Sequence, residues 1–258
     1  AAAATPTPVP SPTPWTYATY TPTLPPADLP AAGINPLTGL PAQDKALLEE
    51  RPVLVKIANW PQSLRPAAGL NQADLVFEYY IGFQMNHLAA VFHGRDSERV
   101  GPLAPARMVD ARLAEHYQGI VAYASADSTV EKIFAEVLPD RAFARGFAPC
   151  PAICTITDTT GENTFVDTAA LRTHASEAKE LIETIDLLGF TFDPRLSDWD
   201  ADADTLSVQY ADFSVMEWRF DSETDQYVLY QDFADQGSIT IVQSSNRADG
   251  SRIAFENV

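Results

Sequence analysis

Six titratable side chains in the middle of the chain could carry chemistry: Glu78, His87, His93, Arg107, Asp110 and Asp127. A carboxylate beside a histidine can act as a general acid and base, so Glu78, His87 and Asp127 are the candidate catalytic residues. A guanidinium binds anionic oxygens through paired donors, so Arg107, with Asp110, is the candidate ligand-binding position. In a purely structural alternative, Arg107 pairs with Asp110 or Glu78, and both histidines face solvent.

Cys150 and Cys154 enclose a short loop, Cys-Pro-Ala-Ile-Cys. Two thiolates cannot complete a tetrahedral zinc site by themselves, and a redox Cys-x-x-Cys motif has one fewer intervening residue. A small-loop disulfide and a pair of free buried thiols therefore remain open. We favour the disulfide because the chain has the character of an exported protein.

Aspartates occupy every second position of the run 198–204, which resembles the first half of a calcium-binding loop. The glycine that such a loop needs is replaced by Ala203, and its bidentate glutamate by Gln209. A solvated acidic linker is therefore the expected role, and calcium the weaker alternative. The calcium ligands would be Asp198, Asp200 and Asp202.

The short motifs of common catalytic and nucleotide-binding sites are missing from the sequence. It contains no glycine-rich phosphate loop, no Gly-x-Ser-x-Gly elbow and no His-Glu-x-x-His. We therefore expect no cofactor, and the sequence favours a noncatalytic protein over an enzyme.

Charge argues against a nucleic-acid partner, and hydropathy argues against a transmembrane segment. The chain has 35 acidic against 17 basic residues, a net charge of -18, which repels nucleic-acid phosphates and anionic lipid headgroups. No stretch approaches the roughly 20 consecutive apolar residues of a spanning helix. We expect neither nucleic-acid binding nor a transmembrane segment.

Residues 1–34 are expected to form a disordered spacer, because Thr-Pro and Ser-Pro recur there and proline rings favour an extended backbone. The chain opens with Ala1 and shows no leader, so we expect that a leader was removed or that the sequence is an excerpt. Such a spacer would hold a folded unit away from the cell envelope. The disordered tail of a cytosolic protein is the alternative.

Hydrophobic periodicity predicts the elements that position the candidate residues. Strands are expected over residues 52–58, 74–80, 86–93 and 120–126, and helices over residues 106–117, 128–138 and 168–188. Residues 140–162 are expected to be rich in loops. In the first helix, Val109 should face the core, with Arg107 and Asp110 on the other side.

The predicted fold class is α+β. Residues 35–192 are expected to form a mixed α/β domain, and residues 193–258 a smaller β-rich domain, with the Pro, Asp and Trp content of 193–204 marking the boundary. An alternating strand starts near Ile253 without a closing turn, so we expect the natural chain to continue past Val258.

Several motifs carry a family resemblance: Asn35-Pro-Leu-Thr-Gly-Leu-Pro41, Arg51-Pro-Val-Leu-Val-Lys-Ile-Ala-Asn59, Val76-Phe-Glu78, Val100-Gly-Pro102 with Ala106-Arg107, and later Trp218, Phe220-Asp221 and Tyr227. In order and spacing they resemble the YerB-like lipoproteins. The resemblance implies a bacterial, exported or lipid-anchored protein with N- and C-terminal domains of unknown function. Arg107 and Glu78 match polar positions of that family, whereas His87 and Ala104 stand where its pattern has arginines.

These observations lead to one functional expectation and one alternative. We expect an extracytoplasmic, membrane-tethered binding or scaffolding module of the cell envelope, whose lipid anchor would precede Ala1 and whose partner is an envelope protein or glycan. The alternative is an envelope-polymer hydrolase or transferase, or a small-ligand-binding protein, that uses Glu78, His87 and Arg107. The alternative predicts that these three side chains converge in one site.

Overall fold

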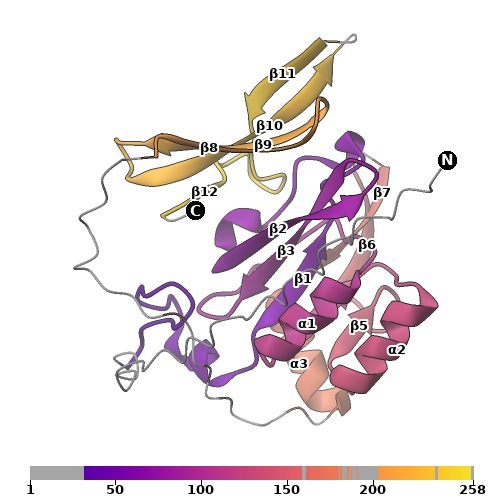
Figure 1. Ribbon diagram of the computed structural model, residues 1–258. Helices are drawn as coiled ribbons and strands as arrows, with labels where there is room; N and C mark the ends of the chain where they lie inside the picture. The colour runs from indigo at the N-terminus through magenta and orange to yellow at the C-terminus, as the bar shows by residue number, and fades with distance from the viewer. Residues whose placement is uncertain are drawn as a thin grey trace, which may run out of the picture.

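The structure is a computed structural model that describes residues 32–158, 161–179, 203–235 and 238–256, together with Leu181, Ile185, Leu187 and Phe190. Within these ranges the chain forms two five-stranded sheets, a two-stranded sheet and three α-helices (Figure 1). The fold is therefore α+β, which confirms the predicted class.

The first sheet has the strand order β2-β3-β1-β4-β5. Its strands are β1 (Val53–Ile57), β2 (Leu75–Gly82), β3 (Met85–Phe92), β4 (Ile120–Tyr123) and β5 (Ala142–Ala144). β1, β4 and β5 run parallel, whereas β3 is antiparallel to both β1 and β2. Because β1 is central and covered on both faces, it is almost entirely apolar, and its single charged residue is Lys56.

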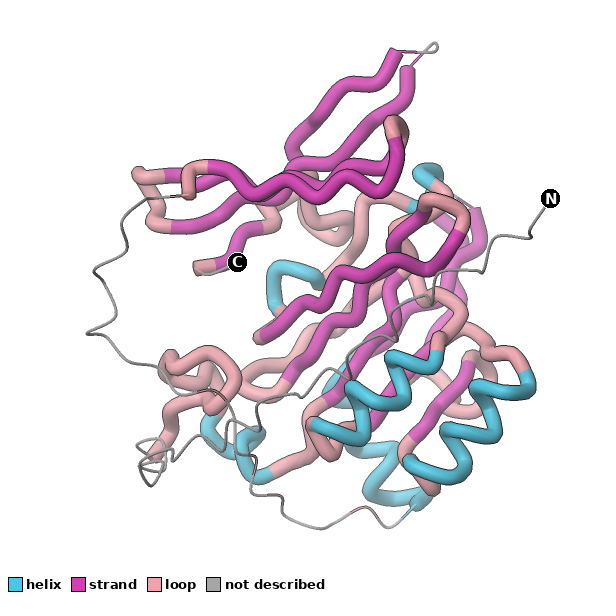
Figure 2. Tube along the Cα trace, viewed as in Figure 1, coloured by secondary structure: helices cyan, strands magenta, loops and turns pink. Residues whose placement is uncertain are grey.

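Helices cover both faces of the first sheet. α1 (Met108–His116) and α2 (Ser128–Val137) pack on one face, where Leu54 and Val91 share a core with Ala111 and Phe134. α3 (Thr168–Lys179) packs on the other face. Short 3-10 helices occupy the connections: η1 (Lys45–Glu49), η2 (Gln62–Leu64) and η3 (Leu70–Gln72). Figure 2 shows that the second large sheet consists of strands and loops without a helix of its own.

The second large sheet has the order β11-β10-β9-β8, and β12 pairs with the other end of β10. Its strands are β8 (Thr205–Ala211), β9 (Ser214–Asp221), β10 (Gln226–Asp235), β11 (Ser238–Gln243) and β12 (Ala254–Phe255). The end of β10 and the whole of β11 project from the body as a hairpin (Figure 1). We call this hairpin, residues 232–235 and 238–243, the β10–β11 arm.

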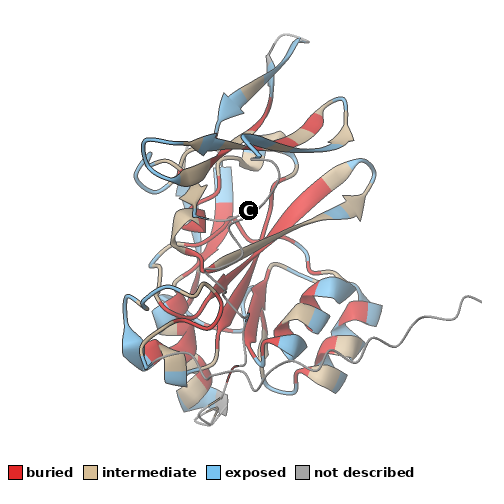
Figure 3. Ribbon diagram, turned by 60° about the vertical axis from the view of Figure 1, so that its left-hand side comes forward, coloured by how far each residue is buried: buried red, intermediate tan, exposed pale blue. Residues whose placement is uncertain are grey.

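One apolar core joins the two large sheets. Val55 and Leu88 of the first sheet belong to the same buried cluster as Met216, Trp218 and Leu229 of the second. Figure 3 shows the buried residues concentrated in the central strands. The second sheet therefore packs on the face of the first sheet that is opposite α1 and α2.

The stretch of residues 140–162 that the sequence predicts to be rich in loops also holds β5, β6 (Ile153–Asp158) and the start of β7 (Gly161–Val166). Among the described strands β6 pairs with β7 alone, and Ile153 is its only buried side chain. A strand with a single buried side chain leaves no alternating hydrophobic signal to detect. None of the helices in the described ranges is long and apolar enough to span a membrane.

Candidate functional site

A buried charged triad lies between the first sheet and α1. Lys56 Nζ of β1 donates a hydrogen bond to the Tyr79 hydroxyl of β2, and that hydroxyl donates one to Asp110 Oδ1 of α1. The Lys56 ammonium also lies 3.8 Å from Asp110 Oδ2 and 4.0 Å from the centre of the Tyr79 ring. The three side chains form one hydrogen-bonded unit that begins in a central strand.

Strand register brings these side chains together. Lys56 lies opposite Ala89 on β3, and Tyr79 lies opposite His87 two residues earlier on the same strand. All four side chains therefore share the face that α1 covers, and the small Ala89 leaves room for the lysine stem. A lysine inside an otherwise apolar strand was the signal in the sequence that could have revealed the triad.

Asp110 corrects the predicted orientation of α1. The sequence pattern placed it on the solvent side and Val109 in the core, but Asp110 is 1% exposed and Val109 is 38% exposed. A buried ammonium without a carboxylate is far more costly than one exposed valine, so the helix turns its acid inward. Asp110 Oδ2 also accepts from the backbone N–H of Arg107 at 2.7 Å, which satisfies a free donor at the helix start.

Burial dominates the electrostatics of the triad. It lowers the pKa of Lys56 to about 8 against the opposing attraction of Asp110. It also raises the pKa of Asp110 and of Tyr79. Because the lysine side chain has no exposed surface, its amine is a partner of Asp110 and is closed to a substrate.

Arg107 stands at the start of α1, beside the triad and half exposed. Its guanidinium donates to the Ala106 carbonyl at 3.3 Å, and no carboxylate in the described ranges lies within 4.0 Å of it. The predicted pairing of this side chain with Asp110 or Glu78 is therefore not formed. Its charge acts on the neighbouring groups, since it lowers the pKa of both Lys56 and His87.

His87 lies on the same side of the sheet and is buried, so the expectation that it faces solvent is wrong. Its Nε2 is 3.3 Å from the Trp60 carbonyl oxygen, and its Nδ1 has no partner within the part of the chain that is described. Burial, with the charge of Lys56, lowers the pKa of His87 to about 3. The ring is neutral at physiological pH and stands among cations.

Glu78 lies on the opposite face of the sheet, because it is the strand neighbour of Tyr79. Its Oε1 accepts from Asn86 Nδ2 at 3.0 Å, and burial raises its pKa. Glu78, His87 and Arg107 therefore do not converge in one site, although the alternative function needs them to do so. The sequence placed them close along the chain, but strand alternation separates them.

Asp127 is an exposed residue that begins α2. Its Oδ1 accepts from the backbone N–H groups of Thr129 at 2.8 Å and Val130 at 3.0 Å. This is the geometry of a helix N-cap.

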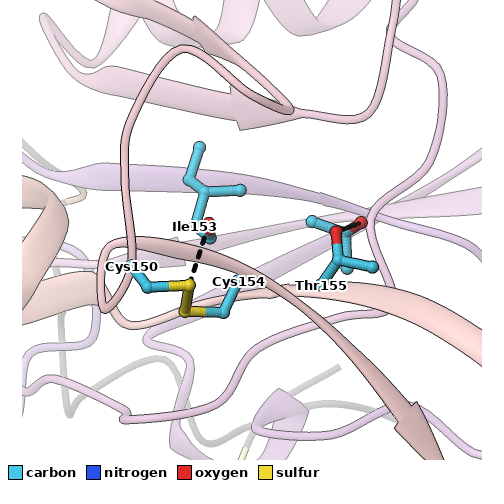
Figure 4. The surroundings of a disulfide bond; sticks show 5 residues. Cys150, Ile153, Cys154 and Thr155 are labelled. Atoms are coloured by element: carbon cyan, nitrogen blue, oxygen red, sulfur yellow. Dashed lines mark hydrogen bonds between the residues drawn. A yellow bond between two sulfur atoms is a disulfide. The ribbon is translucent and has the colours of Figure 1, made fainter.

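The cysteines lie outside this region. The structure joins Cys150 and Cys154 by a disulfide that closes the turn before β6, with their Cα atoms 5.0 Å apart (Figure 4). The carbonyl oxygen of Ile153 lies 3.9 Å from Cys150 Sγ.

The weak calcium candidates Asp198, Asp200 and Asp202 lie outside the described residues. Across residues 32–158, 161–179, 203–235 and 238–256, no three His, Cys, Asp or Glu side chains are grouped to hold a metal ion.

A second polar network, which the sequence did not reveal, links the two large sheets. Each member donates to the next in a chain that runs Ser244, Gln231, Asn59, Asn86 and Glu78. The donor-acceptor distances are 2.9, 2.7, 3.0 and 3.0 Å. Glu78 is the final acceptor of this chain of hydrogen bonds, which starts beside the second large sheet and ends in the first. Glu78 therefore belongs to the interface between the two sheets.

The class of protein follows from the family comparison. Residues 37–180 match the family described as "Protein of unknown function (DUF3048) N-terminal domain", and the chain belongs to that family. A relative, "Putative lipoprotein YerB" of Bacillus subtilis (strain 168), is 38% identical over 85 residues. That match covers 33% of this chain and 25% of the relative.

The crystal structure of the YerB protein from Bacillus subtilis has the same fold, with a TM-score of 0.68 at 21% identity. The superposition covers 85% of this chain and 71% of that one. The resemblance to the YerB-like family that the sequence predicted is thereby confirmed.

Proposed function

We propose that this chain is a noncatalytic binding module of the bacterial cell envelope that binds a ligand carboxylate at Arg107. The module would be displayed outside the membrane on the proline-rich residues 1–34 and tethered by a lipid anchor ahead of Ala1. Its similarity to a relative named as a lipoprotein and the composition of that segment support this placement. The module would comprise a domain of residues 35–192 and a second of residues 193–258.

One observation carries the binding proposal: although the chain is strongly acidic, the Arg107 guanidinium pairs with no carboxylate among the residues that the structure describes. The nearest acid in sequence, Asp110, is fully engaged by Lys56, Tyr79 and the Arg107 backbone N–H. Arg107 therefore keeps guanidinium donors for an external anion, and a planar fork of donors suits a carboxylate.

The surroundings of Arg107 favour a single negative charge. The start of α1 adds positive potential, while Asp110 balances the charge of Lys56 and His87 is neutral. A polyanion would be repelled by the net charge of -18. The ligand class is therefore a molecule with one carboxylate on an otherwise uncharged body, such as an acidic sugar of an envelope glycan.

The geometry offers less support for a hydrolase or transferase. Glu78 and His87 lie on opposite faces of the sheet, and Asp127 is engaged as a helix cap. Acid-base chemistry needs its two groups within reach of one substrate atom. Binding without chemistry is therefore the function that the arrangement supports best.

Calorimetric titration with two matched sugars tests the proposal. N-acetylmuramic acid carries a carboxylate that N-acetylglucosamine lacks, so we expect only the acid to bind. Arg107→Ala should weaken that binding by about tenfold or more, because a hydrogen bond to a charged group contributes about 1.5–3 kcal/mol.

Arg112→Ala is the matched control, since Arg112 lies on the same helix and is exposed in a pair with Glu115. It should leave the affinity unchanged. Equal binding of both sugars, no binding of either, or equal loss in the Arg112 variant would each contradict the proposal.

A further inference from the structure

β11 is an edge strand without the usual protection. It pairs with β10 in an unbroken register of six residue pairs, and no strand in the described ranges pairs with its other edge. Natural edge strands are commonly protected by a charge, a proline or a bulge. The edge strands β2 and β8 each have an irregularity in register, whereas β11, Ser-Ile-Thr-Ile-Val-Gln, has none of these features.

The β10–β11 arm also exposes apolar side chains on both faces. Phe233 and Val242 lie on one face and are 53% and 41% exposed, and Ile239 on the other face is 41% exposed. The arm projects away from the first sheet, so little of the molecule covers it (Figure 1). An exposed apolar hairpin with a free edge is a template for another strand.

We propose that β11 pairs antiparallel with β11 of a second copy of this chain, about a two-fold axis that passes midway between Thr240 of one copy and Thr240 of the other. A two-fold axis perpendicular to a sheet keeps each side chain on its own face. Even-numbered residues of one copy must therefore lie opposite even-numbered residues of the other, and odd-numbered opposite odd-numbered. Centred on Thr240, the pairing sets Thr240 against itself and Ile239 against Ile241 of the second copy.

This register suits both faces. Four isoleucines gather on one side, and two threonines with flanking Val242 and Ser238 gather on the other. Cross-strand pairs of β-branched residues and of threonines are favourable in antiparallel sheets. The free backbone donors and acceptors of both edges are satisfied at the same time.

The self-complementary order Ile239-Thr240-Ile241 identifies a second copy as the occupant of this edge, and charge permits this contact. Two chains of net charge -18 repel each other, so they can approach most easily through an uncharged segment, and residues 238–243 carry no charge. Added salt should therefore strengthen the dimer, because it screens the repulsion between the bodies while the contact itself is neutral. The paired segment is short, so the affinity belongs to the weak end of specific interfaces.

Analytical ultracentrifugation of the 258-residue chain tests the dimer from micromolar to millimolar protein, at low and high salt. We expect a concentration-dependent dimer that salt strengthens. Thr240→Lys sets two ammonium groups opposite each other and should raise the dissociation constant at least tenfold, a change of about 1.4 kcal/mol. Thr205→Lys, at an exposed position on the edge strand β8, is the control and should leave the dimer intact.

A cross-linking experiment tests the register. Thr240→Cys should form a covalent dimer on mild oxidation, because directly opposed residues have Cβ atoms about 4.5–5.5 Å apart. Ser238→Cys, which faces Val242 of the second copy, should not. A chain that stays monomeric at every concentration, a dimer that survives Thr240→Lys, or equal cross-linking at both positions would overturn the proposal.

Discussion

Gln231 of β10 donates from Nε2 to Asn59 Oδ1, 2.7 Å away, across the boundary between the two large sheets. Both side chains are buried, so neither can replace this bond with water. The bond is the central link of the chain of amides that ends at Glu78. It fixes the second sheet against the first in one orientation, in addition to the apolar contacts around it.

Gln231→Leu should therefore destabilise the whole protein. It leaves the Asn59 oxygen and the Ser244 hydroxyl without the partners they have in the native chain. An unsatisfied buried polar group costs about 1–3 kcal/mol, and urea denaturation should show a loss of free energy of unfolding in that range. Gln209→Leu, at an exposed position on β8, should change stability by less than about 0.5 kcal/mol. Equal effects would show that the network adds nothing.

The pair of Lys56 and Asp110 should behave as one unit in a double-mutant cycle. Lys56→Met alone, or Asp110→Asn alone, leaves a buried polar group without its partner, and each should reduce the free energy of unfolding by about 3–5 kcal/mol. The double variant should lose much less than the sum, because no uncompensated charge remains. Additive losses measured by urea denaturation would argue against the pairing.

Lys56 should also make stability depend on alkaline pH. In the unfolded chain a lysine keeps its proton up to about pH 10.4, whereas the folded protein releases it near pH 8. The unfolded state binds more protons between these values, so the free energy of unfolding should rise from pH 8 toward pH 10 relative to Lys56→Met. The raised pKa of Tyr79 opposes this only above about pH 10. Parallel pH profiles of the two proteins would contradict this result.

Glu78→Gln should separate an interface role from a binding role. A glutamine oxygen still accepts from Asn86, and burial no longer penalises a charge, so stability at pH 7 should be unchanged or higher. The native protein should lose stability as pH rises from about 4.3 through the raised folded pKa, and the variant should lack this slope. Calorimetry should find the affinity for N-acetylmuramic acid unaltered. A loss of binding would show that Glu78 takes part in ligand binding.

Asp127→Ala should remove a helix cap and leave function intact. The substitution frees the Thr129 and Val130 amides, and loss of an N-cap typically costs about 0.5–2 kcal/mol. Asp127→Asn should retain most of the stability, since asparagine also caps helices well. Chemical denaturation measures both variants, and impaired sugar binding in a stably folded Asp127→Ala protein would contradict the structural role.

The sequence predicted the strands β1 to β4 and the helix α2 to within a few residues, because each has a clear apolar period. The sequence-based prediction failed where the buried residues do not follow the hydrophobic period of the element. The strand β6 has only one buried side chain, that of Ile153, and α1 turns the charged Asp110 toward the core. The first error follows from a missing hydrophobic signal, and the second from a partner on a strand more than 50 residues earlier.

By itself the sequence determined the α+β class, the family, the acidic character and the residues that could carry charge-based chemistry. These properties depend on composition, local period and motif spacing, all of which are written along the chain. The tertiary structure alone decided that Lys56 meets Asp110 and that Glu78 and His87 face apart. Strand register and helix packing set those contacts, and they depend on distances between segments that no local pattern records.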